Sequence, residues 1–203
     1  MAFIYTYTWD TSTSTEWTYT NPDSTTGLYT GGSRRRWNWD SNDTPSSGCG
    51  PTSGELTGSL LNAGYIYTEA SSATTYNDQF IMENNTVFDT KASAILITFY
   101  TNQRGTSNNS TCELQTNESN AGWVTRATFG GSSDPSKVAS NGVDIWALRT
   151  VDLSDVVGDN STRIRLVVTM PSSGTVWHND YGIDTFTIVG IDRFQQQKHQ
   201  MII

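Results

Sequence analysis

Aromatic and polar residues alternate near the start of the chain. Residues 3–9 and residues 17–20 each place an aromatic ring at every second position, with mostly threonine between the rings. A β-strand directs successive side chains to opposite faces, so a period of two produces one apolar face and one wetted face. The pattern therefore predicts two strands that each cover one side of a core.

Similar short apolar runs continue along the chain, separated by clusters rich in Gly, Ser, Asn, Asp and Pro. Such clusters at residues 102–110, 130–136 and 171–174 are typical of turns. A single helical turn is expected at residues 153–157. Many short strands with little helix indicate a sandwich or barrel, so we expect an all-β, two-sheet antiparallel jelly-roll sandwich over residues 1–191. The further predicted strands are 65–70, 93–101, 112–116, 123–129, 146–152, 162–170 and 182–191.

The last twelve residues, 192–203, differ from the rest. They are polar for most of their length and end in three apolar residues. A tail with this pattern either frays or lies as an extended arm on a neighbouring molecule. We expect the arm, with its apolar side chains in contact with a partner: Phe194, Met201, Ile202 and Ile203.

Composition supports one folded domain and limits its partners. The chain has 203 residues, of which 11% are aromatic, so it can bury a core without staples. The formal net charge of −8 would repel a phosphate backbone, so no nucleic-acid partner is expected. The N-terminus resembles no signal peptide and no apolar stretch approaches membrane-spanning length, so we expect cytoplasmic synthesis and no membrane partner.

The chain contains two cysteines, Cys49 and Cys112. They are either independent thiols or one bridge, and a bridge would need an oxidising compartment and closely spaced Cα atoms. The sequence leaves both alternatives open.

Three blocks, taken in order, resemble the MAM domain, an extracellular jelly-roll family of adhesion receptors and proteases. The first pairs a W-x-W motif with a turn-rich hairpin, the second is a G-x-Y-x-Y-x-E-A-S strand, and the third contains V-D-L-S, I-R-L and a final G-I-D-T-F-T-I strand. The resemblance implies the jelly-roll sandwich. The blocks occupy residues 37–40 with 44–53, residues 64–71, and residues 146–188.

Departures from the family pattern weaken any transfer of its receptor role. Gly54 and Glu55 stand where the family usually has an acidic residue and a histidine, and Thr185 replaces its second aspartate. The family's disulfide pattern is also missing. We therefore do not carry over the extracellular adhesion role.

The resemblance also implies a cation site. Some members of the superfamily hold a structural Ca²⁺ or Na⁺ between the first and last strands, and calcium takes six to eight oxygen ligands. The alternative is that these carboxylates are solvated or hydrogen-bonded. The candidate ligands in this chain are Asp10, Asp40, Glu69 and Asp184.

Nothing in the sequence forms a recognisable catalytic motif. His178 and His199 belong to no zinc-binding pattern, and no G-x-S-x-G elbow accompanies a histidine. Four aspartates fall in turn-like segments, where solubilising charge explains them better than a glycosidase pair. We expect no enzyme activity. These aspartates are Asp144, Asp152, Asp155 and Asp159.

One basic run, Arg34, Arg35 and Arg36, interrupts an otherwise acidic chain. It either guards an exposed edge strand against unwanted pairing or contacts an acidic neighbouring subunit. Both interpretations remain open.

The main functional hypothesis is a structural protein of a virus particle, in particular a capsid decoration (cement) protein of a tailed bacteriophage, located in the virion. Its partner would be the major capsid protein or another virion protein, which it would clamp through its arm and loops. Bound copies would stabilise the shell by mass action. Closed symmetry suggests a homo-oligomer, with a trimer favoured.

The alternative hypothesis is a carbohydrate-binding or adhesive β-sandwich module. Aromatic rings beside turns can stack on sugar rings, whereas the same rings in strands usually fill the core. The candidate stacking residues are Trp17, Trp123 and Trp177.

Overall fold

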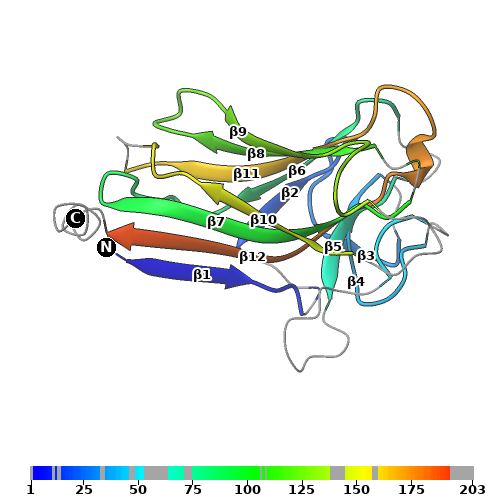
Figure 1. Cartoon of the computed structure of the whole chain (residues 1–203), viewed down its shortest axis with the longest axis horizontal. Helices are drawn as coiled ribbons and strands as arrows, with labels where there is room; N and C mark the ends of the chain where they lie inside the picture. Colours follow the sequence, from blue (N-terminus) through cyan, green and yellow to red (C-terminus); the bar gives the residue numbers. More distant parts are fainter. Residues whose placement is uncertain are drawn as a thin grey trace.

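The described residues form two β-sheets packed face to face, which confirms the predicted all-β sandwich (Figure 1). They belong to a computed structural model in which residues 2–10, 12, 15–32, 35–45, 49–52, 64–70, 75–105, 107, 109–137, 145–156 and 160–192 are described. Within them, no helix has the length and apolar character needed to cross a membrane.

The larger sheet, called the large sheet below, has seven strands within the described residues. Its long strand β12 pairs with β7 on one side, and on the other side with β5 near its start and β1 near its end. The pair β3–β4 is parallel and the other pairs are antiparallel. The strands, in spatial order, are β10 (Ala147–Asp152), β7 (Ser93–Asn102), β12 (Tyr181–Asp192), β5 (Tyr65–Thr68), β4 (Trp37–Asp40) and β3 (Tyr29–Thr30), with β1 (Phe3–Tyr7) also beside β12.

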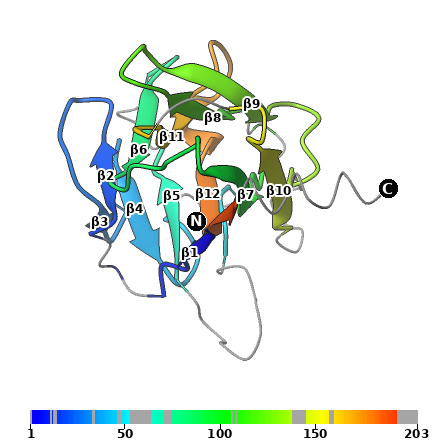
Figure 2. The ribbon, with the colours of Figure 1, turned by 90° about the vertical axis from the view of Figure 1, so that its left-hand side faces the viewer.

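The small sheet covers the inner face of the large sheet. The described part of the chain contributes five antiparallel strands to it, β2 (Trp17–Thr20), β6 (Gln79–Asn84), β11 (Arg163–Thr169), β8 (Thr111–Asn117) and β9 (Val124–Gly130). Figure 2 shows the two layers from one end. A short 3-10 helix, η1 (Val176–His178), lies in the connection from β11 to β12.

An aromatic row fills the space between the sheets. Phe186 of β12 packs against Trp17 and stacks on Phe99, with ring centroids 5.0 and 5.2 Å apart, and Phe99 meets Phe129 at 5.4 Å. These rings come from both sheets, and each large aromatic side chain buries 150–250 Å² in typical cores. The row therefore joins the two layers at their centre.

Strand β12 is irregular where it changes partners. The register with β7 shifts between Asp184 and Thr187, and Thr185 adopts a φ of 46°. The buried Asp184 carboxylate accepts the Thr185 N–H at 2.7 Å. This backbone N–H therefore supplies one hydrogen-bond partner to a carboxylate that lies on an apolar strand.

The strand predictions hold with shifted ends, and four elements were missed: β3, β4, β6 and η1. Strand β6 alternates clearly, with Phe80 and Met82 buried, but its polar neighbours concealed it. The two-residue β3 and the helix η1 are too short to give a period. Residues 153–156 form a turn closed by the Val156 N–H to the Leu153 carbonyl at 3.0 Å, in place of the expected helical turn.

The structure answers the question of the cysteines but not that of the C-terminal arm. Cys49 and Cys112 are both buried and no disulfide joins them. Strand β12 ends at Asp192, and the arm residues Phe194, Met201, Ile202 and Ile203 lie outside the described residues. The arm therefore stays a prediction.

Candidate functional site

A pocket of about 410 Å³ opens at one end of the sandwich. This end carries η1 and lies opposite the end where β1 begins and β12 finishes (Figure 1). The turn that precedes β6 and the loop that connects β11 to β12 form its walls. The lining residues are Thr75, Tyr76, Gly174, Thr175, Val176 and Trp177.

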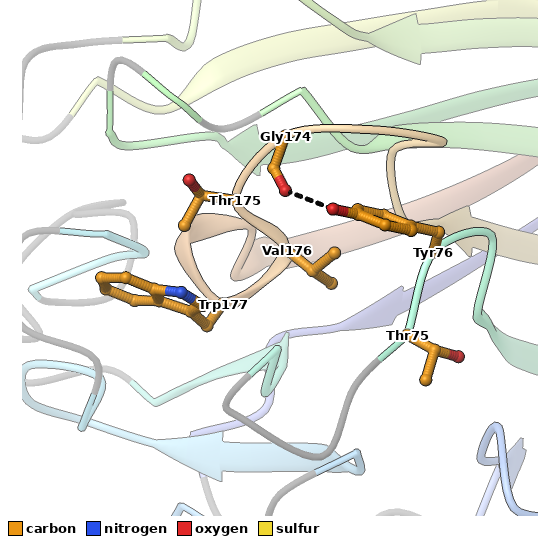
Figure 3. A pocket seen from close by; sticks show the side chains of 6 residues that line it. All are labelled: Thr75, Tyr76, Gly174, Thr175, Val176 and Trp177. Atoms are coloured by element: carbon orange, nitrogen blue, oxygen red, sulfur yellow. Dashed lines mark hydrogen bonds between the residues drawn. The ribbon is translucent and has the colours of Figure 1, made fainter.

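Two exposed aromatic side chains distinguish this pocket from the rest of the molecule. Trp177 is 53% exposed and Tyr76 is 51% exposed, the highest values of any aromatic residues that the structure describes. In Figure 3 the side chain of Val176 lies between the two rings. Aromatic rings of this size are usually buried, so the exposure of both rings indicates a surface suited to binding a ligand or a partner.

One hydrogen bond ties the two walls together. The Tyr76 hydroxyl donates to the Gly174 carbonyl at 2.9 Å, shown as a dashed line in Figure 3. The phenolic oxygen keeps its acceptor capacity after making this bond. Gly174 has a φ of +91°, a conformation that side chains disfavour, which explains glycine at this position.

The loop that carries Trp177 is anchored from beneath. Asn179 donates its side-chain amide to the carbonyls of Thr175 and Val176 at 2.6 and 2.9 Å, and its own amide oxygen accepts the Asn109 N–H at 2.7 Å. Val176 is buried in the core. The exposed indole is therefore presented by a fixed backbone, which lowers the entropy lost on binding.

The opposite wall is a turn held by a carboxylate. Asp78 accepts the Thr75 N–H at 2.8 Å and the Thr75 hydroxyl at 2.9 Å. Arg35 pairs with Asp78 at 3.0 Å, so one arginine of the basic run fixes this turn. The site thus has rigid walls on both sides.

The three tryptophans proposed from the sequence have different environments. Trp17 is 4% exposed and belongs to the aromatic row of the core, so its assignment to glycan stacking was wrong. Trp123 is half-buried, and the guanidinium of Arg165 lies 4.1 Å from its ring centroid. Only Trp177 of the three stands in the pocket.

Tyr76 was missed by sequence reasoning. It sits in the polar run Thr74-Thr75-Tyr76-Asn77-Asp78, and a lone aromatic residue within turn-forming residues was the available signal. Such a residue has few neighbours to bury it, which is the physical reason for its exposure.

The four carboxylates proposed as cation ligands do not form one cluster. Among the described residues, no group of three or more His, Cys, Asp and Glu side chains is placed to hold a metal ion. Asp10 is exposed and accepts the Thr8 hydroxyl, and Asp40 accepts N–H groups of its own turn. Glu69 and Asp184 are buried. Hydrogen bonds within their own segments engage three of these side chains, Asp10, Asp40 and Asp184, in agreement with the hydrogen-bonded alternative. The bound cation stays a prediction.

The basic run is engaged within the chain. Arg35 pairs with Asp78, Arg36 pairs with Asp23 at 2.6 Å, and Arg36 also lies over the Tyr29 ring. Arg34 lies outside the described residues. A contact of this run with a neighbouring subunit stays a prediction.

Comparison with known proteins identifies the fold. No family model matches the chain and no curated protein matches it, so the resemblance to MAM domains stays a prediction. Solved structures do match. The K1 cleaved adhesin domain of Lys-gingipain from Porphyromonas gingivalis W83 has a TM-score of 0.56 at 11% identity, covering 92% of this chain and 97% of that one.

Two further structures give the same picture. The K2 cleaved adhesin domain of Lys-gingipain has a TM-score of 0.55 at 14% identity, covering 92% of this chain and 99% of that one. TmCBM61, solved in complex with β-1,4-galactotriose, has a TM-score of 0.50 at 11% identity, covering 89% and 92%. At these identities the likeness shows a shared β-sandwich fold.

Proposed function

We propose that this chain is a non-enzymatic carbohydrate-binding or adhesive β-sandwich module, with its binding site in the pocket beside η1. The observation that carries the proposal is the pair of exposed rings, Trp177 and Tyr76, on rigid loops around a pocket of about 410 Å³. A volume of that size falls in the usual range for small-ligand sites, about 300–1,000 Å³.

The chemistry of the lining matches a sugar. A pyranose ring has an apolar C–H face that packs on an aromatic ring, and hydroxyl groups around its rim that need hydrogen-bond partners. Trp177 and Tyr76 supply aromatic faces. The hydroxyl groups of Thr75, Thr175 and Tyr76 supply polar atoms at the same site.

The charge distribution favours neutral saccharides. Every lining residue is uncharged, and the whole chain has a formal net charge of −8. Uronic, sialylated or sulfated glycans would meet repulsion and find no cation in the lining to offset it. We therefore expect binding of neutral hexose chains over acidic ones.

The structural neighbours support this class over the capsid function. One of them is described as a complex with β-1,4-galactotriose and two as adhesin domains. The decoration hypothesis places its contacts in the C-terminal arm and the loops, and two of its candidate contact residues, Arg35 and Arg36, are already paired within the chain.

The test is a glycan array followed by calorimetry with the purified full chain. Neutral oligosaccharides, including β-1,4-linked galactose oligomers, should give the strongest signals. Replacing the pocket aromatics, Trp177→Ala or Tyr76→Ala, should weaken binding by about two- to tenfold, because an aromatic stacking contact is worth about 0.5–1.5 kcal/mol. Both side chains are about half exposed, so the melting temperature should change little.

The matched control is Trp123→Ala. This tryptophan also lies at the surface, but Arg165 and Arg163 occupy its ring, so its replacement should leave glycan affinity unchanged. The proposal fails if no neutral glycan binds, or if Trp123→Ala abolishes binding while Trp177→Ala does not.

A further inference from the structure

Strand β1 forms an edge of the large sheet. Its five residues pair with β12 in antiparallel register, from Phe3 opposite Gly190 to Tyr7 opposite Phe186. Among the described residues, no strand pairs with the other side of β1. Figure 1 shows it beside β12. Alternate N–H and C=O groups of an edge strand point away from its neighbour and can accept another strand.

The remaining edges of the described sheets carry features that discourage such pairing. Strand β10 carries the inward-pointing charge Arg149, and β9 carries Arg126 next to a register shift. Strand β3 has two residues. The outer side of β2 is occupied, because the Gly27 N–H donates to the Tyr19 carbonyl and Thr20 bridges to Thr26. Charges, shortness, irregularity and cover are the usual protections.

Strand β1 has none of these protections. Its sequence, FIYTY, contains no charge, no proline and no glycine. Ile4 is 71% exposed, the highest value among the large hydrophobic residues that the structure describes, and Tyr5 is 40% exposed. An exposed hydrophobic edge without protection is either a liability or an interface.

We propose that β1 is a homodimer interface, in which β1 of one copy pairs antiparallel with β1 of a second copy. A two-fold axis near the middle of a strand makes that strand its own complement, which is the requirement for a closed dimer. The formal net charge of −8 makes two copies repel over most of their surface. Strand β1 adds no charge to this repulsion and carries no acidic side chain with which a cationic partner could pair, so the edge itself fits a second copy.

Both faces of the joined sheets would gain cover. On the outer face, Ile4 extends the apolar row that continues across the sheet through Val189 and Leu96. On the inner face, Tyr5 packs against Phe3 and Phe88, with ring centroids 5.4 and 6.0 Å away. A second Tyr5 opposite the first would cover the exposed side of this ring cluster, and such cross-strand aromatic pairs are stabilising.

The geometry has a consequence that rests on the proposed function. Strand β1 runs towards the end of the molecule that carries η1 and the pocket (Figure 1). An antiparallel partner runs the opposite way, so the two pockets would lie at opposite ends of the dimer. Such a dimer would link two glycan-bearing surfaces, instead of binding one surface twice.

The test measures the mass of the full chain in solution, without any glycan, by light scattering and sedimentation over a dilution series. The wild-type chain should dissociate reversibly from dimer to monomer. The outward-facing substitutions Ile4→Lys and Thr6→Lys should each raise the dimer dissociation constant by about tenfold or more, because the two-fold axis brings the added charges together. Both positions are exposed, so the fold should persist.

The matched control is Leu148→Lys, which places the same charge on β10, at another edge of the same sheet. Leu148 is 56% exposed, and its replacement should leave the dissociation constant unchanged. A wild-type chain that stays monomeric at the highest concentration overturns the proposal. So does a dimer that survives both β1 variants or is lost equally in Leu148→Lys. Since no glycan is present, these outcomes are independent of the glycan-binding test.

Discussion

At the scale of single residues, a buried ion pair is the most consequential polar feature. Arg149 of β10 donates to the carboxylate of Asp134 and to the Thr101 hydroxyl, the latter at 2.7 Å. Burial alone would raise the pKa of Asp134, but hydrogen bonds from Ser136 and Arg149 outweigh it and hold the pKa below its usual value. The ionised form of Asp134 is therefore favoured by folding.

This pair predicts a pH dependence of stability. Because the pKa of Asp134 is lowered in the folded state, its contribution is complete above the unfolded-state value of about 3.9 and disappears as the pH falls through the folded-state value. Asp134→Asn should lower the unfolding free energy at neutral pH by about 3 kcal/mol, since it leaves Arg149 buried without its counter-ion.

The measurement is urea unfolding at neutral pH and through the acid range. The unfolding free energy of Asp134→Asn should fall less between neutral and acid pH than that of the wild type. The exposed control Asp155→Asn should behave like the wild type. A variant whose stability falls with acid as steeply as the wild type would contradict the assignment.

At the scale of elements, the attachment of β1 to β12 depends on a missing side chain. The Phe3 ring lies across Gly190, where an added Cβ would stand 2.2 Å from a ring carbon. Phe3 also stacks on Phe88 at 5.7 Å between ring centroids. Glycine at position 190 therefore lets the first strand lie close to the last one.

Replacing this glycine should loosen β1. Gly190→Ala forces the Phe3 ring to move, so we expect a loss of about 1–3 kcal/mol in unfolding free energy, measured by urea denaturation. The control Thr187→Ala on the outer face of β12 should change stability by less than about 0.5 kcal/mol. In the double variant Phe3→Ala/Gly190→Ala, the loss of unfolding free energy should be smaller than the sum of the losses in the two single variants. Strict additivity would argue against the contact.

At the scale of the whole molecule, the two thiols report different kinds of opening. Cys112 is the second residue of β8 and lies in the core, and burial raises the pKa of its thiol far above the usual value. Cys49 is also buried, but its sulfur lies 3.6 Å from the Trp177 carbonyl in the loop region beside the pocket. A thiolate is the reactive form of cysteine, so burial protects both.

In the native protein, we expect both thiols to react with a disulfide reagent much more slowly than a solvent-exposed thiol does. Cys112 should react at the rate of global unfolding, and Cys49 should react sooner, through local opening of the pocket loops. Single Cys→Ser variants assign the two phases. Immediate labelling of Cys112 in native buffer would contradict the core position of β8.

The sequence alone predicts those features of the fold that depend on neighbouring residues. Alternation located most strands and the all-β class, because side-chain period is a local property of a strand. The positive φ of Gly50, +74°, agrees with the turn-rich hairpin expected over residues 44–53. The turn before Trp177 placed this residue in a loop, where rings have few neighbours.

The tertiary structure decided which of these features act together. Trp17 and Trp177 both stand beside turn residues in the sequence, yet one joins Phe186 in the core and the other faces water. Tyr76 and Trp177 are about a hundred positions apart and meet only because β6 and β11 are neighbours in the small sheet. Burial and convergence depend on contacts between distant segments, and local period carries no information about them. The sequence therefore determined most of the strands, and packing determined the core, the open edge of β1 and the pocket.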